Sequence, residues 1–273
     1  MLLEMNTTDM HEIADIACNF TSDRFDNDLD EIIDRAIANH ITKFGLICSR
    51  LRDIDKLLEI YNRYSKNMFF TIGVHPHHAN EINTEYLEKL KEVINKNNPH
   101  AIGETGLDFF RNLSTYEEQM YAFEEQIKIA IDTNKPLFLH QRDSHEDFIK
   151  ILRKYSSDIS KAVVHCFTGT QSQLDDYLEL DCYIGVTGWI CDEKRNVELR
   201  KTIKNIPLSK LMIETDCPYL IPKNLLDKPK NNRNEPSYLN HIVTEISILL
   251  DTNEEDIRNE SFKNTLSFFQ SVN

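Results

Sequence analysis

Metal-capable side chains stand directly after several short apolar segments of this chain. The histidines and carboxylates at these positions are His75, His77, Glu104, His140, His165, Glu214 and Asp216. Imidazole nitrogens and carboxylate oxygens are common donors to divalent cations in hydrolytic sites. Held together around such a cation, they could polarise a substrate oxygen and activate a bound water. The pattern therefore predicts metal-dependent hydrolysis, provided that the fold brings the segment ends together.

Short apolar or β-branched runs alternate with longer amphipathic stretches along the whole chain. The expected strands are residues 13–18, 44–48, 68–74, 100–103, 136–140, 162–166, 182–186 and 210–214. The expected helices are residues 28–39, 53–66, 84–96, 116–134, 145–155, 171–179, 237–250 and 254–269. This alternation indicates a parallel sheet, and eight strands predict a single (β/α)8 TIM barrel with extra C-terminal helices. The carboxyl ends of barrel strands open on one face, so the metal-capable residues would share one cavity.

Length and composition agree with one large domain. The 273 residues are 40% hydrophobic, which is enough to bury a substantial core. We expect residues 1–12 to form an N-terminal tail and residues 13–273 to form the barrel domain. The irregular stretch 217–236 contains four prolines and would be a loop at the barrel mouth. No GxGxxG or GxxxxGK[ST] motif is present, which disfavours a doubly wound nucleotide-binding sheet.

The net charge bears on which ligands the protein can bind, and the cysteine pattern bears on its cellular compartment. The net charge of −14 opposes diffuse binding to nucleic acid, so a polyanionic substrate must be held locally. The six cysteines include no CxxC pair, which favours free thiols in a reducing compartment. No apolar run approaches the roughly 18 residues of a membrane span, and the start lacks the pattern of a secretory signal. We therefore expect a cytoplasmic protein without membrane contact.

Each candidate residue also has a structural explanation when it is taken alone. A single histidine at a strand end usually forms a structural hydrogen bond, and a glutamate after glycine often begins a helix. The coincidence that Glu104, His140, His165 and Asp216 each close a separate apolar run favours a shared site. The structural explanation is preferred for His11, His40, His78, His100, His145 and His241, and packing is preferred for Trp189.

Seven segments resemble motifs of one protein family, in that family's order. They are GVHPH (73–77), IGETGLDFFRN (102–112), PLFLHQRDSHEDF (136–148), VVHCFTGT (163–170), YIGVTGW (183–189), LMIETDCPYL (211–220) and NRNEP (232–236). Together they resemble the TatD-family deoxyribonucleases, within the amidohydrolase-like metal-dependent hydrolases. The resemblance extends over the chain from about Asp15 onward.

The first expected strand departs from the wider family's pattern. Many members carry Asp-x-His-x-His there, whereas this chain has Ala17 and Asn19 at the histidine positions after Asp15. The sequence is therefore similar to the TatD subtype that lacks the pair. A site with fewer nitrogen ligands and more oxygen and water favours Mg²⁺, with Mn²⁺ or Zn²⁺ as alternatives. Whether one or two ions bind is left open.

The resemblance implies a nuclease that removes nucleotides from the 3′ end of single-stranded DNA, with RNA as a second candidate substrate, in DNA repair or degradation. Glu104, His140 and His165 would hold the cation, and Asp216 would be a further ligand, the base that activates water, or both. Glu214 would share the direction of Asp216 by strand alternation and act beside it. The expected substrate-binding residues are Asn19, His75, His77, Arg111, Arg142 and Arg233. We expect a monomer.

The alternative function is hydrolysis of an amide, lactone or phosphoester of a small molecule on the same barrel. Against it, the first-strand histidine pair is missing, and Glu104 stands where a metal-bridging lysine would end the fourth strand. A non-catalytic binding barrel is disfavoured because clustered ionisable groups usually occur where they act. Apurinic-site endonuclease activity is a variant that the sequence does not rank.

Overall fold

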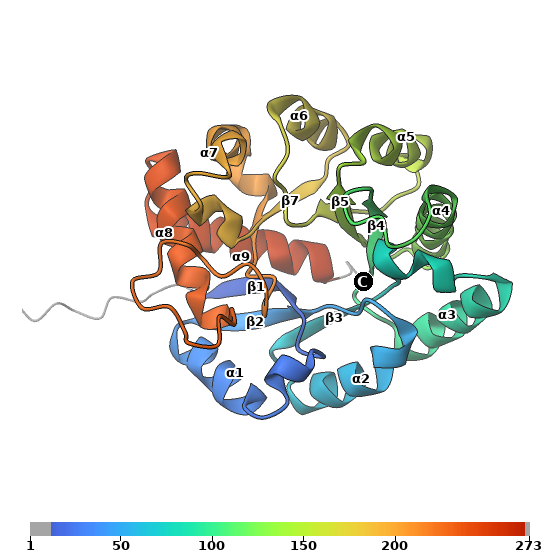
Figure 1. Ribbon diagram of the computed structural model, residues 1–273, viewed down its shortest axis with the longest axis horizontal. Helices are drawn as coiled ribbons and strands as arrows, with labels where there is room; N and C mark the ends of the chain where they lie inside the picture. Colours follow the sequence, from blue (N-terminus) through green and yellow to red (C-terminus); the bar gives the residue numbers. More distant parts are fainter. Residues whose placement is uncertain (1–11, 271–273) are drawn as a thin grey trace, which may run out of the picture.

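Eight apolar segments form one parallel sheet in the computed structural model, which describes residues 12–270. The strands are β1 (Ile13–Cys18), β2 (Ile41–Leu46), β3 (Met68–Ile72), β4 (Ala101–Asp108), β5 (Leu137–Arg142), β6 (Ala162–Val164), β7 (Tyr183–Val186) and β8 (Leu211–Ile213). Each strand pairs in parallel with the next one in chain order. A bridge between Cys18 and Cys217 brings the two ends of the sheet together, which confirms the predicted TIM barrel (Figure 1).

Helices surround this ring of strands. They are α1 (Leu29–Ala38), α2 (Ile54–Arg63), α3 (Thr84–Asn97), α4 (Tyr116–Asp132), α5 (His145–Tyr155), α6 (Gln171–Glu179), α7 (Val197–Thr202), α8 (Leu239–Leu250) and α9 (Glu254–Phe269). Capping boxes formed by Thr115 with Glu118 and by Thr170 with Gln173 begin α4 and α6. The sequence did not predict α7, whose six residues are too few for a clear periodic pattern.

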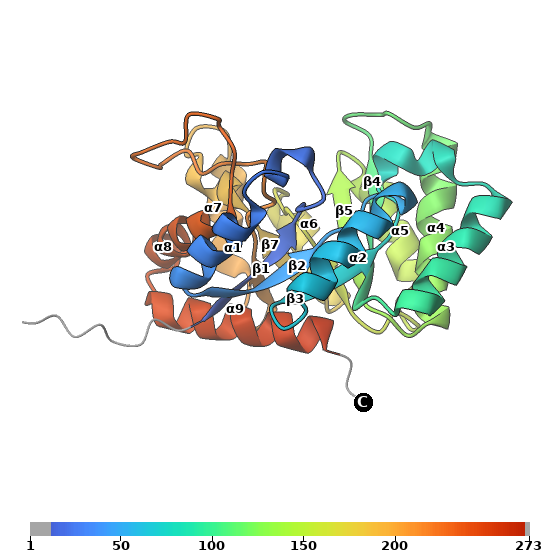
Figure 2. The same ribbon diagram turned by 90° about the horizontal axis from the view of Figure 1, so that it is seen from below.

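The C-terminal helix α9 closes one end of the barrel. It lies across the end of the ring opposite the long mouth loop (Figure 2). Phe268 and Phe269 join a buried cluster with residues from the strands, including Ile16, Phe69 and Phe138. The rings of Phe69 and Phe269 stack with centroids 4.9 Å apart. Since this end is filled by aromatic packing, the opposite end of the barrel remains available for a site.

Strand β4 extends beyond the expected segment 100–103. Its pairing with β5 continues to Asp108, which lies opposite Arg142. The sequence did not predict this extension because Glu104 and the glycines at 103 and 106 interrupt the apolar pattern of the strand. Gly106 has φ +146°, and a Cβ there would lie 1.9 Å from the carbonyl oxygen of His140, so the close approach of β4 and β5 requires glycine.

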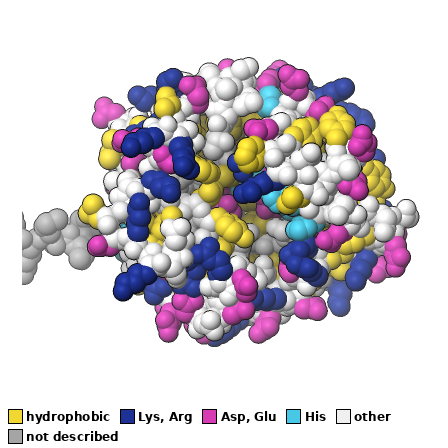
Figure 3. Space-filling view, in the orientation of Figure 1, with side chains coloured by type: hydrophobic (Ala, Val, Ile, Leu, Met, Phe, Trp, Pro, Cys, Tyr) yellow, Lys and Arg dark blue, Asp and Glu magenta, His cyan; other side chains and the backbone are white. Residues whose placement is uncertain are grey.

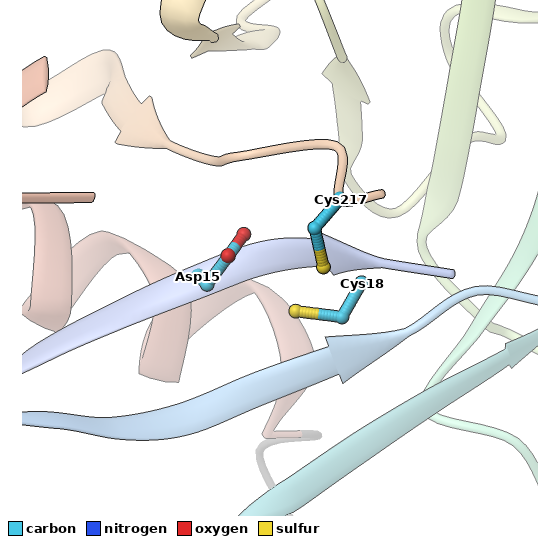
Figure 4. A group of neighbouring side chains, drawn as sticks. All are labelled: Asp15, Cys18 and Cys217. Carbon is cyan, nitrogen blue, oxygen red and sulfur yellow. The ribbon is translucent and has the colours of Figure 1, made fainter. Parts of the chain in front are cut away.

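Asp15 joins the first strand of the barrel to the segment after the last. Its carboxylate accepts hydrogen bonds from the backbone N–H groups of Ala17 and Thr215 and from the Thr215 hydroxyl. Cys18 and Cys217 lie beside it (Figure 4), and the three side chains offer ligand atoms within 4.8 Å of one another. Since the Asp15 oxygens already have three donors, we assign this fully buried group to barrel closure.

Three further sequence expectations concern the N-terminal tail, membrane-spanning helices and the state of the cysteines. Apart from Glu12, the expected tail of residues 1–12 lies outside the described residues. Within residues 12–270, no helix combines the length and the apolar character needed to cross a membrane. All six cysteines are free thiols, as expected.

Replacing Phe269 with alanine should destabilise the barrel. The change removes a fully buried ring from the stack on Phe69, and buried Phe→Ala changes usually lower the free energy of unfolding by about 3–5 kcal/mol. Urea unfolding followed by far-UV circular dichroism measures the loss. Ile248→Ala, at a side chain that is 68% exposed, is the control and should change stability by less than about 0.5 kcal/mol. An equally small change for Phe269→Ala would contradict the role given to α9.

Asp15 should make stability fall as the pH rises. Burial raises the pKa of its carboxyl from 3.8 to about 7, despite the opposing hydrogen bonds from Thr215 and Ala17. Because its pKa is higher in the folded than in the unfolded state, the folded protein favours the protonated Asp15 carboxyl. The stability that depends on this proton is fully present below about pH 4 and is lost as the pH rises through 7. Asp15→Asn has no such charge, so its stability relative to the parent protein should improve from pH 4.5 to 8. Urea titrations over this range test it, with the exposed Asp55→Asn as the control for one lost charge; a pH-independent difference for Asp15→Asn would refute it.

Candidate metal centre

Glu104 lies at the centre of a cluster of imidazoles at the carboxyl ends of the strands. Its Oε1 atom is 2.8 Å from Nε2 of His165, 3.0 Å from Nδ1 of His140 and 3.3 Å from Nε2 of His75. Glu104 and His140 belong to β4 and β5, whereas His75 and His165 follow β3 and β6. Four neighbouring strands therefore deliver one group each to the same point.

The donor atoms fit a small divalent cation. Nδ1 of His140 and Nε2 of His165 are 3.4 Å apart, and both face Oε1 of Glu104. Metal–ligand bonds of about 2.0–2.2 Å place neighbouring donors roughly 3 Å apart, which matches these separations. His75, Glu104 and His140 also have ligand atoms within 4.8 Å of one another. The residues present can thus hold a metal ion.

Two of these imidazoles, His140 and His165, each face a further carboxylate with their other ring nitrogen. Nε2 of His140 is 3.3 Å from Oδ2 of Asp108, and Nδ1 of His165 is 3.5 Å from Oε2 of Glu214. The two atoms of the second pair are buried, and neither forms a hydrogen bond within the described residues. Outer carboxylates of this kind select the tautomer and orientation of a ligating histidine. Asp108 and Glu214 therefore leave Nδ1 of His140 and Nε2 of His165 directed toward the cation position.

His75 is arranged as a hydrogen-bond donor. Its Nδ1 atom accepts a hydrogen bond from the backbone N–H of His77, and burial lowers its pKa to about 4. The ring is therefore neutral at pH 7 and carries its proton on Nε2, the nitrogen that faces Glu104. In this state Nε2 can donate to an oxygen anion, and coordination of a metal ion by Nε2 would require the loss of that proton. The substrate-binding role expected for His75 stays a prediction.

The cluster distributes charge between Glu104 and two histidines. Burial by itself would raise the pKa of Glu104, but His75, His165 and His140 outweigh it and hold that pKa well below its ordinary value. Burial opposes charge on His140 and His165 as well. Hydrogen bonds with Asp108 and Glu104 nevertheless raise the pKa of His140, and the charges of Glu104 and Glu214 raise that of His165. Without a cation, a carboxylate and protonated imidazoles stabilise one another.

Asp216 lies at the edge of the same cluster, held by Asn19. The Asn19 amide donates a hydrogen bond of 2.9 Å to Oδ1 of Asp216. Both residues line the cavity above the cluster. Burial raises the pKa of Asp216 to about 7, and the neighbouring carboxylates Glu104 and Glu214 add to this while His165 opposes it. A carboxyl group with such a pKa can take up and release a proton near neutral pH.

Glu214 and Asp216 differ in their access to the cavity. Asp216 lines the cavity and has φ +55°, whereas Glu214 is fully buried beside His165. This position suits Glu214 to orienting His165. The catalytic role expected for Glu214 stays a prediction.

The three expected phosphate-binding arginines separate into two groups. Arg111 and Arg142 line the cavity, near His77 on its wall. Arg233 does not line it. Its guanidinium forms two hydrogen bonds with the carboxylate of Asp28, at 2.8 and 2.6 Å, and its side chain is 11% exposed. The structure therefore uses Arg233 to tie the mouth loop to the start of α1.

Asp108 is a site residue that the sequence reasoning missed. Its Oδ2 atom contacts Nε2 of His77 at 2.7 Å and Nε2 of His140, and its Oδ1 accepts from the backbone N–H groups of Phe110 and Arg111. Burial opposes its charge, but these hydrogen bonds lower its pKa. Residues 104, 106 and 108 share one side of a strand, so extending the expected strand past 103 would have revealed Asp108.

The cavity above the cluster is wide and polar. Its volume is about 1740 Å³, beyond the roughly 300–1,000 Å³ of sites for small ligands. Figure 3 shows the hollow near the centre of this face, with hydrophobic and basic side chains around it. The arginines that line it are Arg50, Arg52, Arg111, Arg142 and Arg195. Carboxylates such as Asp53, Asp143 and Asp147 also line the cavity, so a negatively charged ligand would be held by individual guanidinium groups and not by a net positive lining.

A barrel with this cluster at its carboxyl-end mouth has the architecture of a hydrolase with a possible metal-binding group. The family model described as TatD related DNase matches residues 14–270. A "3′-5′ ssDNA/RNA exonuclease TatD" of Escherichia fergusonii is 42% identical over 85% of this chain and 89% of that protein. One of Pantoea vagans is 37% identical over 94% and 98% of the two chains. The chain therefore belongs to the TatD-related DNase family.

Solved structures agree with this assignment. A hydrolase TatD family protein from Entamoeba histolytica has a TM-score of 0.85 and 30% identity, with 95% of this chain and 98% of that chain covered. A TatD homologue from Escherichia coli K12 has a TM-score of 0.87 at 24% identity, covering 94% and 97% of the two chains, which supports the fold. The sequence prediction of the family and of the barrel is confirmed.

Cation binding should release protons at neutral pH. The raised pKa values of His140 and His165 favour the protonated rings in the metal-free protein, whereas a ligating ring must have one unprotonated nitrogen. Affinity for Mn²⁺ should therefore increase as the pH rises toward 8. Isothermal titration calorimetry in buffers of different ionisation enthalpy measures the protons released. His165→Asn should reduce that number and His145→Gln should leave it unchanged; binding without proton release would contradict the charge assignment.

Proposed function

We propose that this protein is a divalent-metal-dependent nuclease that removes nucleotides from the 3′ end of single-stranded DNA, with RNA as a second substrate. The observation that carries the proposal is the convergence of Glu104, His140, His165 and Asp216 at the floor of a wide, arginine-lined cavity. The similarity to proteins named 3′-5′ ssDNA/RNA exonucleases supports the same substrate class. Mg²⁺ is the expected cation; the imidazole donors also suit Mn²⁺ and Zn²⁺.

Glu104, His140 and His165 would hold the cation, with Asp216 at the same cavity. When bound, it supplies Lewis-acid polarisation of the phosphoryl oxygen and lowers the pKa of a coordinated water. Asp216 lies at the cavity side of the cluster, and its raised pKa suits it to accepting the proton of the attacking water. Asn19 keeps its carboxylate in that direction through the hydrogen bond to Oδ1.

The remaining residues bind and orient the phosphodiester. His75 presents the protonated Nε2 atom to the centre and can donate a hydrogen bond to a phosphate oxygen. His77, held by Asp108, lines the cavity next to it. Arg111 and Arg142 can form paired hydrogen bonds with backbone phosphates. Because such contacts carry no base information, we expect weak sequence preference and strong sensitivity to salt. Cytoplasmic residence, a monomeric state and a role in DNA repair stay predictions of the sequence.

Digestion of end-labelled oligonucleotides tests the proposal. Metal-stripped protein supplied with Mg²⁺, Mn²⁺ or Zn²⁺ should shorten single strands from the 3′ end and leave blunt duplexes largely intact. Glu104→Ala removes the central ligand and should abolish shortening, and Asp216→Asn should lower the rate about 10²–10⁴-fold through loss of the base. Glu146→Gln removes a carboxylate that lines the same cavity outside the cluster, so it is the matched control and should retain activity.

Two results would overturn this function. Shortening that persists in Glu104→Ala or without any divalent cation would remove the metal centre from the reaction. Absence of cleavage with every cation, together with hydrolysis of a small amide, lactone or phosphoester, would favour the alternative substrate class on the same barrel.

A further inference from the structure

A large apolar ring stands exposed on the wall of the polar cavity. Phe110 is 56% exposed and lines the cavity two residues after Asp108. Aromatic side chains are enriched at binding interfaces, where a free ring face offers a large contact area. The ring is absent from the buried clusters that hold the barrel together. Phe110 therefore has a place and an exposure that packing does not explain.

The guanidinium of Arg142 covers this ring. Its Cζ atom lies 3.9 Å from the centroid of Phe110, within the range of a cation–π contact. Arg142 also lines the cavity and is itself exposed. A planar guanidinium on an aromatic ring fixes the orientation of both groups, and each can stack with a nucleic-acid base. The pair thus presents a flat, cationic stacking surface at the mouth.

This surface is attached rigidly to the metal centre. Asp108 pairs with Arg142 in the β4–β5 ladder, and the N–H of Phe109 donates to the carbonyl of Arg142 at 2.9 Å. The Asp108 carboxylate accepts from the N–H of Phe110 at 3.0 Å while its other oxygen contacts His140. Arg142 follows His140 by two residues on one strand, or about 7 Å. The distance from the stacking surface to the cation position is therefore set by backbone geometry.

We propose that Phe110, backed by Arg142, stacks on an unpaired base adjacent to the phosphate held at the metal centre. The inference rests on the proposed nuclease function and names the group that recognises a single strand. Stacking accepts every base, because each has two aromatic faces, which agrees with weak sequence preference. A base inside a duplex has both faces covered by its neighbours, so Phe110 selects for unpaired ends.

Tyr219 provides the internal comparison. It is 54% exposed and lines the same cavity, but it follows β8, on the opposite side of an eight-stranded ring from β4. No guanidinium lies over its ring among the cation–π contacts of the described residues. Tyr219→Ala therefore tests whether any exposed aromatic ring of the mouth has the same effect.

Paired substrates separate stacking from structural effects. One oligonucleotide has normal bases throughout, and the other has abasic residues at its last two 3′ positions. On the normal strand, Phe110→Ala should lower kcat/KM about 5- to 150-fold, mainly through KM, which is the range of base–aromatic stacking. On the abasic strand it should have no effect, and Phe110→Tyr should restore the parent rate. Tyr121→Ala, at an exposed aromatic residue on α4 outside the cavity, is the control.

A binding measurement keeps this test independent of turnover. A strand with 2-aminopurine at the 3′ end should lose fluorescence when Asp216→Asn protein binds it with Mg²⁺, and Phe110→Ala in that background should abolish the quenching. Cleavage that is equally slowed on both strands, or a loss that follows Tyr219→Ala instead, overturns the stacking role. If the strand binds with Phe110-dependent quenching but the parent protein does not cleave it, the stacking role is upheld and the nuclease function is rejected. If the strand is neither bound nor cleaved, both proposals are overturned.

Discussion

The buried negative charge of Glu104 is the constraint on which the active end of this barrel depends. A carboxylate removed from water is tolerated only beside positive charge or several donors. Here three imidazoles from neighbouring strand ends provide those partners, within 3.3 Å of one oxygen. A divalent cation bound here would compete with the protons on the histidines for the same nitrogens. Stability of the metal-free protein and affinity for a metal would therefore depend on the same group.

Asp108 and Glu214 extend this arrangement outward in different directions. Glu214 is sealed behind His165 and acts on one imidazole only. Asp108 uses one oxygen for His77 and His140 and the other for the backbone of the following turn. That turn carries Phe110 and Arg111 into the cavity. A single buried carboxylate therefore couples the positions of His77 and His140 to the cavity wall at Phe110 and Arg111, and it can do so because β4 is long enough to reach Asp108.

The barrel and the convergence of Glu104, His140 and His165 were predictable from the sequence because both depend on a local pattern. Continuous apolar runs end just before His140 and His165, and the carboxyl ends of parallel strands must meet. Asp108 was missed because glycines and a polar residue interrupt the apolar pattern of β4. The different burial of Glu214 and Asp216 could not be read from the sequence, because strand alternation assumes extended backbone, whereas the backbone at Asp216 is left-handed.

Residue types and order by themselves determined the family, the parallel barrel, and the donors available at its mouth. Tertiary structure alone decided which donors share one point, which proton position each imidazole adopts, and which arginines reach the cavity. Arg233 illustrates the difference, because its sequence context suits phosphate binding but its guanidinium is bound to Asp28, far away in the chain. The physical reason is that hydrogen bonds and ion pairs form with whichever partner the packed strands and loops bring within about 3 Å, and sequence separation does not report that distance.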